Sequence, residues 1–260
     1  MAYHSVLYEV RDHIAFITLN RPDKLNALDL ALWRELGEAL KEADRDDDAA
    51  VMIMTGAGRG FCAGDDISIL ADLQSPKDAE DLIVGCIYAL VETIVHLEKP
   101  LIAAVNGLAF GGGCELALLS DLAVASEKAA FALPEGRVGA APLIFAVFGP
   151  PMIGIKATNE LGMLGEPVSA QTARDMGIVN RVVPHEELIP TAVKMAEDIM
   201  LSSPVAMRLI KQTTTKIQAE CLRDFYIVCR RSLGELGKSE DFTEGARAFT
   251  EKRPPRFKGR

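Results

Sequence analysis

Residues 102–115, IAAVNGLAFGGGCE, constrain the fold of this chain more than any other stretch. They predict a short buried strand, a break at Asn106 and Gly107, three glycines, and a carboxylate in the first turn of an apolar helix. A ligand can approach a glycine backbone closely, and the first N–H groups of a helix lack intrahelical partners. The stretch therefore favours an oxyanion site beside Glu115. The plainer interpretation is a tight turn beneath a sheet, with Glu115 complementing the helix dipole at the surface.

Strand and helix patterns alternate up to about residue 185, which is typical of βαβ units in a sheet covered by helices. Strands are expected at residues 5–10, 13–19, 50–55, 102–105, 122–125, 130–135 and 178–183. Helices are expected at 29–45, 75–98, 112–119, 142–148, 169–176, 186–201, 204–236 and 239–252. We therefore predict an α/β fold with a core at residues 1–185 and a helical region at 186–260, and such helical regions often make oligomer contacts.

Composition narrows the function classes. The 260-residue chain has a formal net charge of −9, which argues against general nucleic-acid binding. No apolar run is long enough to span a bilayer, and no secretory signal is visible near the N-terminus. The five cysteines form no Cys-x-x-Cys pair, so a reducing compartment is the simpler expectation. We expect a cytoplasmic protein without nucleic-acid or membrane partners.

Several familiar sequence motifs are incomplete or absent. Gly56 and Gly58 follow a strand as in a dinucleotide-binding fingerprint, but Phe61 stands where the third glycine belongs. Neither a P-loop nor a Gly-x-Ser-x-Gly elbow is present. The four histidines have no metal-ligand spacing, so no metal site is predicted. Cys62 and Cys114 lie beside the glycine-rich breaks, where a small buried hydrophobe is the more ordinary role than a nucleophile.

Two glutamates are more specific candidates. Each of the two glycine-rich breaks, at residues 56–66 and 106–113, can supply a backbone N–H, and two such groups make an oxyanion hole for a carbonyl. Glu115 follows the second break, and Glu135 follows the apolar run 131–134. Apolar surroundings raise the pKa of a carboxylic acid, which suits acid/base work near neutral pH. Glu115 and Glu135 are therefore the predicted catalytic pair.

The chain resembles the enoyl-coenzyme A hydratase/isomerase (crotonase) superfamily over nearly its whole length. The resemblance rests on six segments in order: NRPDKLNAL (20–28), FCAGDDI (61–67), AVNGLAFGGGCELA (104–117), FALPE (131–135), ARDMGIVNRVV (173–183) and FTEKR (249–253). It implies a spiral of ββα units and a C-terminal helical region that builds trimers or dimers of trimers. It also implies an acyl-CoA thioester as the ligand.

Site residues follow from the same resemblance. The backbone N–H groups of Ala63 and Gly112 would form the oxyanion hole. Lys252 and Phe249 would reach the ligand of a neighbouring protomer. The alternative for both Lys24 and Lys252 is a solvated surface lysine. Contacts to coenzyme A are implied for Lys24, Leu25, Ala27, Leu28, Ala63, Gly64, Asp65, Asp66, Ile67, Phe249 and Lys252.

Members that resemble hydratases carry glutamate at both acidic positions, as this chain does. The resemblance therefore implies reversible hydration of an α,β-unsaturated enoyl-CoA to a 3-hydroxyacyl-CoA. Glu115 would deprotonate the water that attacks Cβ, Glu135 would protonate Cα, and no cofactor beyond the coenzyme A of the substrate would be needed. Two alternatives stay open. One is a Δ3,Δ2-enoyl-CoA isomerase that relies mainly on Glu135, and the other is a catalytically silent acyl-CoA-binding member of the fold.

One segment departs from the family pattern. Residues 139–154, GAAPLIFAVFGPPMIG, carry bulkier residues where the family commonly has a glycine pair before its next helix. In family members this segment lines the acyl end of the pocket. The acyl group is therefore open between short straight chains and branched, cyclic or dicarboxylic ones, and neutral change at a helix start is an equal alternative.

Overall fold

A six-stranded sheet forms the centre of the molecule. A computed structural model describes residues 3–66, 83–236 and 238–260. The strand order is β1-β2-β3-β4-β6-β9, and every neighbouring pair is parallel except the β1–β2 hairpin. The strands are β1 (Val6–Arg11), β2 (Ile14–Leu19), β3 (Val51–Gly56), β4 (Leu101–Val105), β6 (Leu122–Ser126) and β9 (Arg181–Val183). The expected hairpin and buried strands are confirmed, and β9 is shorter than expected.

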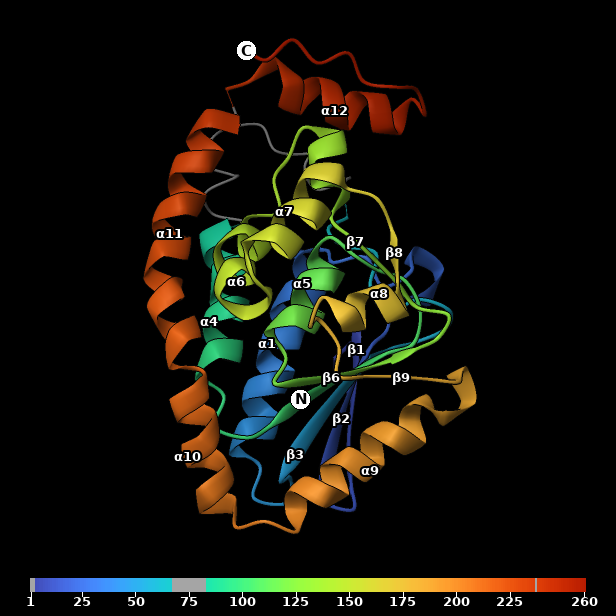
Figure 1. Cartoon of the computed structure of the whole chain (residues 1–260), viewed down its shortest axis with the longest axis vertical. Helices are drawn as coiled ribbons and strands as arrows, with labels where there is room; N and C mark the ends of the chain where they lie inside the picture. Colours follow the sequence, from blue (N-terminus) through green and yellow to red (C-terminus); the bar gives the residue numbers. More distant parts are fainter. Residues whose placement is uncertain (1–2, 67–82, 237) are drawn as a thin grey trace.

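Helices cover both faces of this sheet (Figure 1). Alternate strand residues point to opposite faces, so Met52 and Met54 pack with α1 (Leu30–Arg45), α4 (Ala89–His96) and α5 (Gly112–Leu119). Val51 and Ile53 pack instead with α9 (Leu188–Met200). A parallel sheet buried on both faces explains the near-continuous apolar runs of its strands. The helix α9 thus belongs to the core of the sheet although it follows residue 185.

A small second sheet, β5-β7-β8, lies beside the first. It joins β5 (Ala109–Phe110), β7 (Ala130–Ala132) and β8 (Val168–Ser169). The expected extended run at 130–135 is wrong in its second half, because Glu135 lies in the 3-10 turn η3 (Pro134–Val138). Proline at the start of a helical turn has its φ preset and gives up an N–H that would be unpaired anyway, so Pro134 ends the strand and opens η3.

Local signals located most helix starts. Asp29 caps α1 by accepting from Leu32 N at 2.8 Å, and Ser169 and Ser239 cap α8 (Ala170–Asp175) and α12 (Glu240–Thr250). The expected start at Ser75 lies outside the described residues, and the described part of that expected helix consists of η2 (Ile83–Tyr88) and α4. The helix expected at 142–148 runs further, as α6 (Leu143–Ile153), and is followed by the unexpected α7 (Ile155–Leu164). The long helix expected at 204–236 divides into α10 (Pro204–Thr214) and α11 (Lys216–Leu236).

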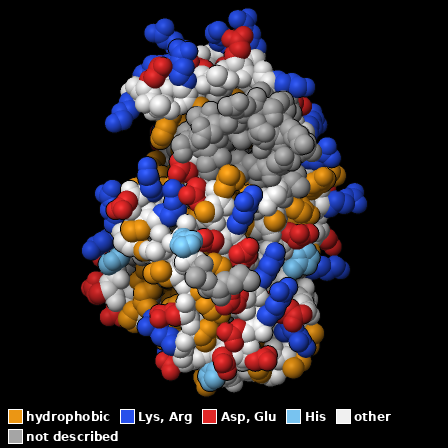
Figure 2. Space-filling model, turned by 180° about the vertical axis from the view of Figure 1, so that it is seen from behind, with side chains coloured by type: hydrophobic (Ala, Val, Ile, Leu, Met, Phe, Trp, Pro, Cys, Tyr) orange, Lys and Arg blue, Asp and Glu red, His pale blue; other side chains and the backbone are white. Residues whose placement is uncertain are grey.

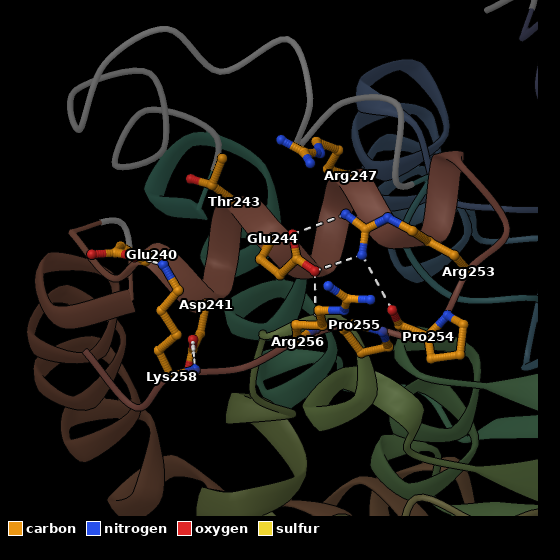
Figure 3. A pocket seen from close by; sticks show the side chains of 10 residues that line it. All are labelled: Glu240, Asp241, Thr243, Glu244, Arg247, Arg253, Pro254, Pro255, Arg256 and Lys258. Atoms are coloured by element: carbon orange, nitrogen blue, oxygen red, sulfur yellow. Dashed lines mark hydrogen bonds and ion pairs between the residues drawn. The ribbon is translucent and has the colours of Figure 1, made fainter.

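The C-terminal tail, residues 253–260, folds back along α12 and is hydrogen-bonded to it (Figure 3). Arg253 donates from both guanidinium nitrogens to the Glu244 carboxylate, at 2.6 and 2.9 Å. The Arg256 N–H also donates to Glu244, at 2.9 Å, and the Gly259 N–H donates to Asp241 at 2.8 Å. These bonds tie the tail to the helix that lies across the top of the molecule in Figure 1.

The surface mixes charges of both signs. On the face shown in Figure 2, Lys and Arg side chains alternate with Asp and Glu rather than gathering into one basic patch. Among the described residues, no helix combines the length and apolar character needed to cross a bilayer.

Candidate active site

The two glycine-rich breaks meet at one edge of the sheet, as the sequence predicts. The Phe110 N–H donates to the Cys62 carbonyl at 2.9 Å, and the Cys62 N–H donates to the Leu108 carbonyl at 3.1 Å. A Cβ on Gly113 would lie 2.2 Å from the Cys62 carbonyl oxygen. Only glycine therefore fits at position 113, where the first helical turn of α5 packs against the other break.

The amide predicted from Ala63 for the oxyanion hole is wrong. The Ala63 N–H already donates to the Leu25 carbonyl at 3.0 Å, so it cannot also hold a thioester oxygen. Two residues on, the Asp65 N–H donates to no backbone carbonyl of the described residues. A Cβ on Gly64 would lie 3.4 Å from Gly112 N, which brings the Asp65 segment against the start of α5. Neither the Asp65 N–H nor the Gly112 N–H donates to a backbone carbonyl of the described residues, and the Asp65 N–H faces its own carboxylate.

Glu115 lies in the first turn of α5 and is 5% exposed. Its Oε1 accepts from the Phe145 N–H at 3.0 Å, at the start of α6, where Pro142 provides no side-chain cap. Burial raises the pKa of Glu115, and the charge of Glu135 raises it further, while the Phe145 bond opposes the rise. A carboxylate of the core thus serves as the cap of a second helix.

Glu135, from η3, also lies beside the start of α5. A Cβ on Gly111 would lie 2.9 Å from Glu135 Oε1, and Gly111 has a φ of 50°, so only glycine suits this position. The Oε2 atom is buried and has no hydrogen-bond partner among the described residues. Burial raises the pKa of Glu135 to about 7, and the charge of Asp65 contributes. The charge of Glu135 disfavours ionisation of Glu115, so ionisation of both buried carboxyl groups is opposed.

The sequence did not identify a contact between Trp33 and Asp65. Trp33 Nε1 donates to Asp65 Oδ1 at 3.0 Å, and the indole, 2% exposed, also packs beside Gly112. Burial raises the pKa of Asp65 to about 6, while the bond from Trp33 opposes the rise. Trp33 is the only tryptophan in the chain, and a buried indole needs a hydrogen-bond acceptor. A buried tryptophan that requires an acceptor was thus the one sequence signal for the contact between Trp33 and Asp65.

A cleft of about 790 Å³ opens above these groups, between η3, the second break and α12. The residues predicted to contact coenzyme A that line it are Lys24, Ala27, Ala63, Gly64, Asp65, Asp66, Phe249 and Lys252. Leu28 is instead fully buried in the core, and the Leu25 side chain lies near Gly60. Ile67 lies outside the described residues. Phe249 and Lys252 line the cleft of their own chain, and a contact with the ligand of a neighbouring protomer stays a prediction.

The cysteines beside the breaks are poorly suited to nucleophilic attack. Cys62 and Cys114 are fully buried, and burial raises the pKa of both thiols, that of Cys62 to about 12. A buried thiol with a raised pKa stays protonated, so the role of small buried hydrophobe is favoured. Within the described ranges, no group of three or more His, Cys, Asp or Glu is placed to hold a metal ion.

Comparison with known proteins decides the family. A family model described as Enoyl-CoA hydratase/isomerase matches residues 9–260. The chain belongs to this family. Among curated relatives, the carnitinyl-CoA dehydratase of Proteus mirabilis is 39% identical over 96% of this chain and 97% of its own length. The 1,2-epoxyphenylacetyl-CoA isomerase of Escherichia coli is 34% identical, over 98% of both chains.

Solved structures confirm the crotonase fold expected from the sequence. A carnitinyl-CoA hydratase from Mycobacterium avium is similar with a TM-score of 0.86 and 38% identity, over 100% of both chains. An enoyl-CoA hydratase from Mycobacterium avium subsp. paratuberculosis has a TM-score of 0.88 and 29% identity, over 99% of this chain and 100% of that one. Sequence and structure thus both support an activity of the enoyl-CoA hydratase/isomerase family, whose members act on acyl-CoA thioesters.

Proposed function

We propose that this chain is an enoyl-CoA hydratase that reversibly adds water across the α,β double bond of an enoyl-CoA. The observation that carries the proposal is the buried pair of Glu115 and Glu135 beside the start of α5. One carboxylate deprotonates the water that attacks Cβ while the other delivers a proton to Cα, and the pair retains the one proton that this exchange needs. We assign the first role to Glu115 and the second to Glu135.

The thioester oxygen lies, in this proposal, between the amides of Gly112 and Asp65. Charge develops on this oxygen as water adds, and preorganised N–H donors stabilise that charge more than they stabilise the substrate. The positive end of the α5 dipole adds to the effect. The phosphates and adenine of coenzyme A lie along the cleft near Lys24 and Lys252. The reacting groups are the carboxyl groups of Glu115 and Glu135, the thioester and water.

An ultraviolet assay tests the proposal directly. Purified protein with crotonyl-CoA should consume the conjugated enoyl-thioester absorbance and yield 3-hydroxybutyryl-CoA. Because relatives are named carnitinyl-CoA dehydratase, carnitinyl-CoA belongs in the same panel, followed in the dehydration direction. Absence of water addition or elimination with straight, branched, cyclic and dicarboxylic substrates would refute the hydratase proposal.

An isomerase is the second candidate, because one relative is named an isomerase. A Δ3,Δ2-enoyl-CoA isomerase moves a proton with one carboxylate, so Glu115→Gln would keep most activity and Glu135→Gln would lose it. A hydratase loses activity in both variants. A protein that binds crotonyl-CoA tightly by calorimetry but turns over no member of the panel would be the silent acyl-CoA-binding alternative.

We also propose that the chain forms a homo-oligomer through its C-terminal helices. Val205, Leu209 and Ile210 on α10 and Ile217 on α11 are each 46–55% exposed, and exposed apolar side chains in such a cluster mark an interaction surface. Sedimentation should show a trimer or hexamer.

We further propose a cytoplasmic location. The described cysteines are all free thiols, which fits a reducing compartment.

A further inference from the structure

A third carboxylate, Asp65, lines the cleft beside the acid/base pair. Asp65 and Glu135 both line the cleft. The Cβ position of Gly111 lies 2.9 Å from Glu135 Oε1 and 3.5 Å from the Cα of Gly64, the residue before Asp65. The residue before Asp65 thus lies against the same glycine as Glu135 does, and the charge of Asp65 acts on Glu135.

Trp33 fixes where this charge lies. Its Nε1 donates to Asp65 Oδ1 at 3.0 Å from the first turns of α1. The neighbouring carboxylate, Asp66, is different, because Arg21 lies 3.2 Å from it and provides a counter-charge. Asp65 receives a neutral donor instead, so its bond orients the carboxylate without cancelling its charge.

The cleft is also lined by four cations. From η1 (Pro22–Lys24), η3 and the residues that follow α12 come the cations Lys24, Arg137, Lys252 and Arg253. Two of these are already paired, Arg137 with Glu166 and Arg253 with Glu244. On the inner side, the buried thiols of Cys62, Cys114 and Cys229 lie near Glu115 and are neutral. Asp65 is thus the nearby group whose negative charge acts on the pair.

We propose that Asp65 is a positioning residue whose Trp33-oriented negative charge keeps the shared proton on the Glu115–Glu135 pair. A like charge nearby disfavours ionisation of a carboxylic acid. The pair thereby retains a proton to give to Cα at a pH where two free glutamates would both be ionised. This role rests on the proposed hydratase chemistry, but the charge effect itself does not require turnover.

Asp65→Asn is the decisive variant, because asparagine keeps an oxygen for Trp33 Nε1 and removes only the charge. The alkaline limb of the pH profile of kcat/KM should move to lower pH by about one unit. Asp198→Asn, which removes an exposed carboxylate paired with Lys194 on α9, should leave the profile unchanged. An Asp65→Asn profile that superimposes on the wild-type profile would overturn the proposal.

Trp33→Phe tests whether the indole acts through Asp65. Loss of the donor raises the pKa of Asp65 and weakens its charge, so the same limb should move in the same direction by less. In the Asp65→Asn background, Trp33→Phe should move the profile no further. A second shift of similar size in the double variant would show that Trp33 acts on the pair by another route.

A ligand that is not turned over separates this inference from the hydratase proposal. Bound acetoacetyl-CoA ionises to an enolate whose ultraviolet absorbance reports its apparent pKa in the site. Removing the Asp65 charge should lower that apparent pKa by a similar amount, whether or not the enzyme hydrates crotonyl-CoA. Equal values in the wild type and Asp65→Asn would refute the charge effect even if hydration is observed, and a lowered value without hydration would refute only the hydratase proposal.

Discussion

The packing of α12 on the segment that carries Glu135 predicts the effect of Gly245→Ala. A Cβ on Gly245 would lie 2.1 Å from the Val138 carbonyl oxygen and 2.8 Å from Gly139 N, whereas an ordinary van der Waals contact needs at least 3.4 Å. The helix or η3 must therefore withdraw by about 1 Å, and a misplacement of that size at a catalytic group costs roughly 100-fold in rate. In free energy this is about 2.7 kcal/mol of transition-state stabilisation.

The assay is kcat for crotonyl-CoA, measured beside a thermal melt. Overpacking costs about 1–3 kcal/mol, and the helix preference of alanine over glycine offsets about 1 kcal/mol of it. The melting temperature should therefore fall by a few degrees while kcat falls about 100-fold. The matched control is Gly162→Ala in α7, where the new Cβ would have 3.7 Å to its nearest neighbour, and kcat should be unchanged. Wild-type kcat in Gly245→Ala would show that α12 does not pack on η3 in the working enzyme.

Three further predictions concern the buried charges. Glu115→Gln and Glu135→Gln should each lower kcat by about 100-fold or more with little change in circular dichroism, since glutamine at position 115 still accepts from the Phe145 N–H; near-normal turnover in both would refute the mechanism. Because the folded pKa of Glu135 is raised to about 7, the folded state keeps its proton longer than the unfolded chain. Its stability contribution is therefore full below about pH 4.3 and is lost as pH rises to 7. The unfolding free energy of Glu135→Gln, from urea titrations, should fall less over this range, by roughly 3 kcal/mol. Lys211, 5% exposed, donates to Asp121 at 2.6 Å, so Lys211→Met should cost about 3 kcal/mol in a urea melt, and an unchanged midpoint would contradict it.

Features set by neighbouring residues could be predicted from the sequence. The Asp29 cap and the buried stripe of Leu32, Leu36 and Leu40 on α1 follow from i, i+3 and i+4 spacing. The two-residue strand β5 could not be predicted in this way, because it forms only when distant segments pair with it. Two residues show no periodicity, so their structure depends on the fold as a whole.

In the candidate site, too, some features follow from local sequence and others depend on the whole fold. The meeting of the two breaks follows from strands that end at the same edge of a parallel sheet, and Glu115 and Glu135 follow from their position after those breaks. The error at Ala63 arose because a motif gives positions but does not show which amide the Leu25 carbonyl already occupies. The pairing of Trp33 with Asp65 spans 32 residues, and only the folded chain brings them together.

The cap that Glu115 provides for α6 does not depend on which side chains α6 carries. Its partner is a main-chain N–H at Phe145, which any residue except proline would provide. Side chains at 143–145 can therefore change in size and shape without removing the bond that orients the Glu115 carboxylate. If Glu115 acts as the proposed base, substitutions in this segment leave its orientation intact. The departure of residues 139–154 from the family pattern is the kind of variation that such an arrangement tolerates.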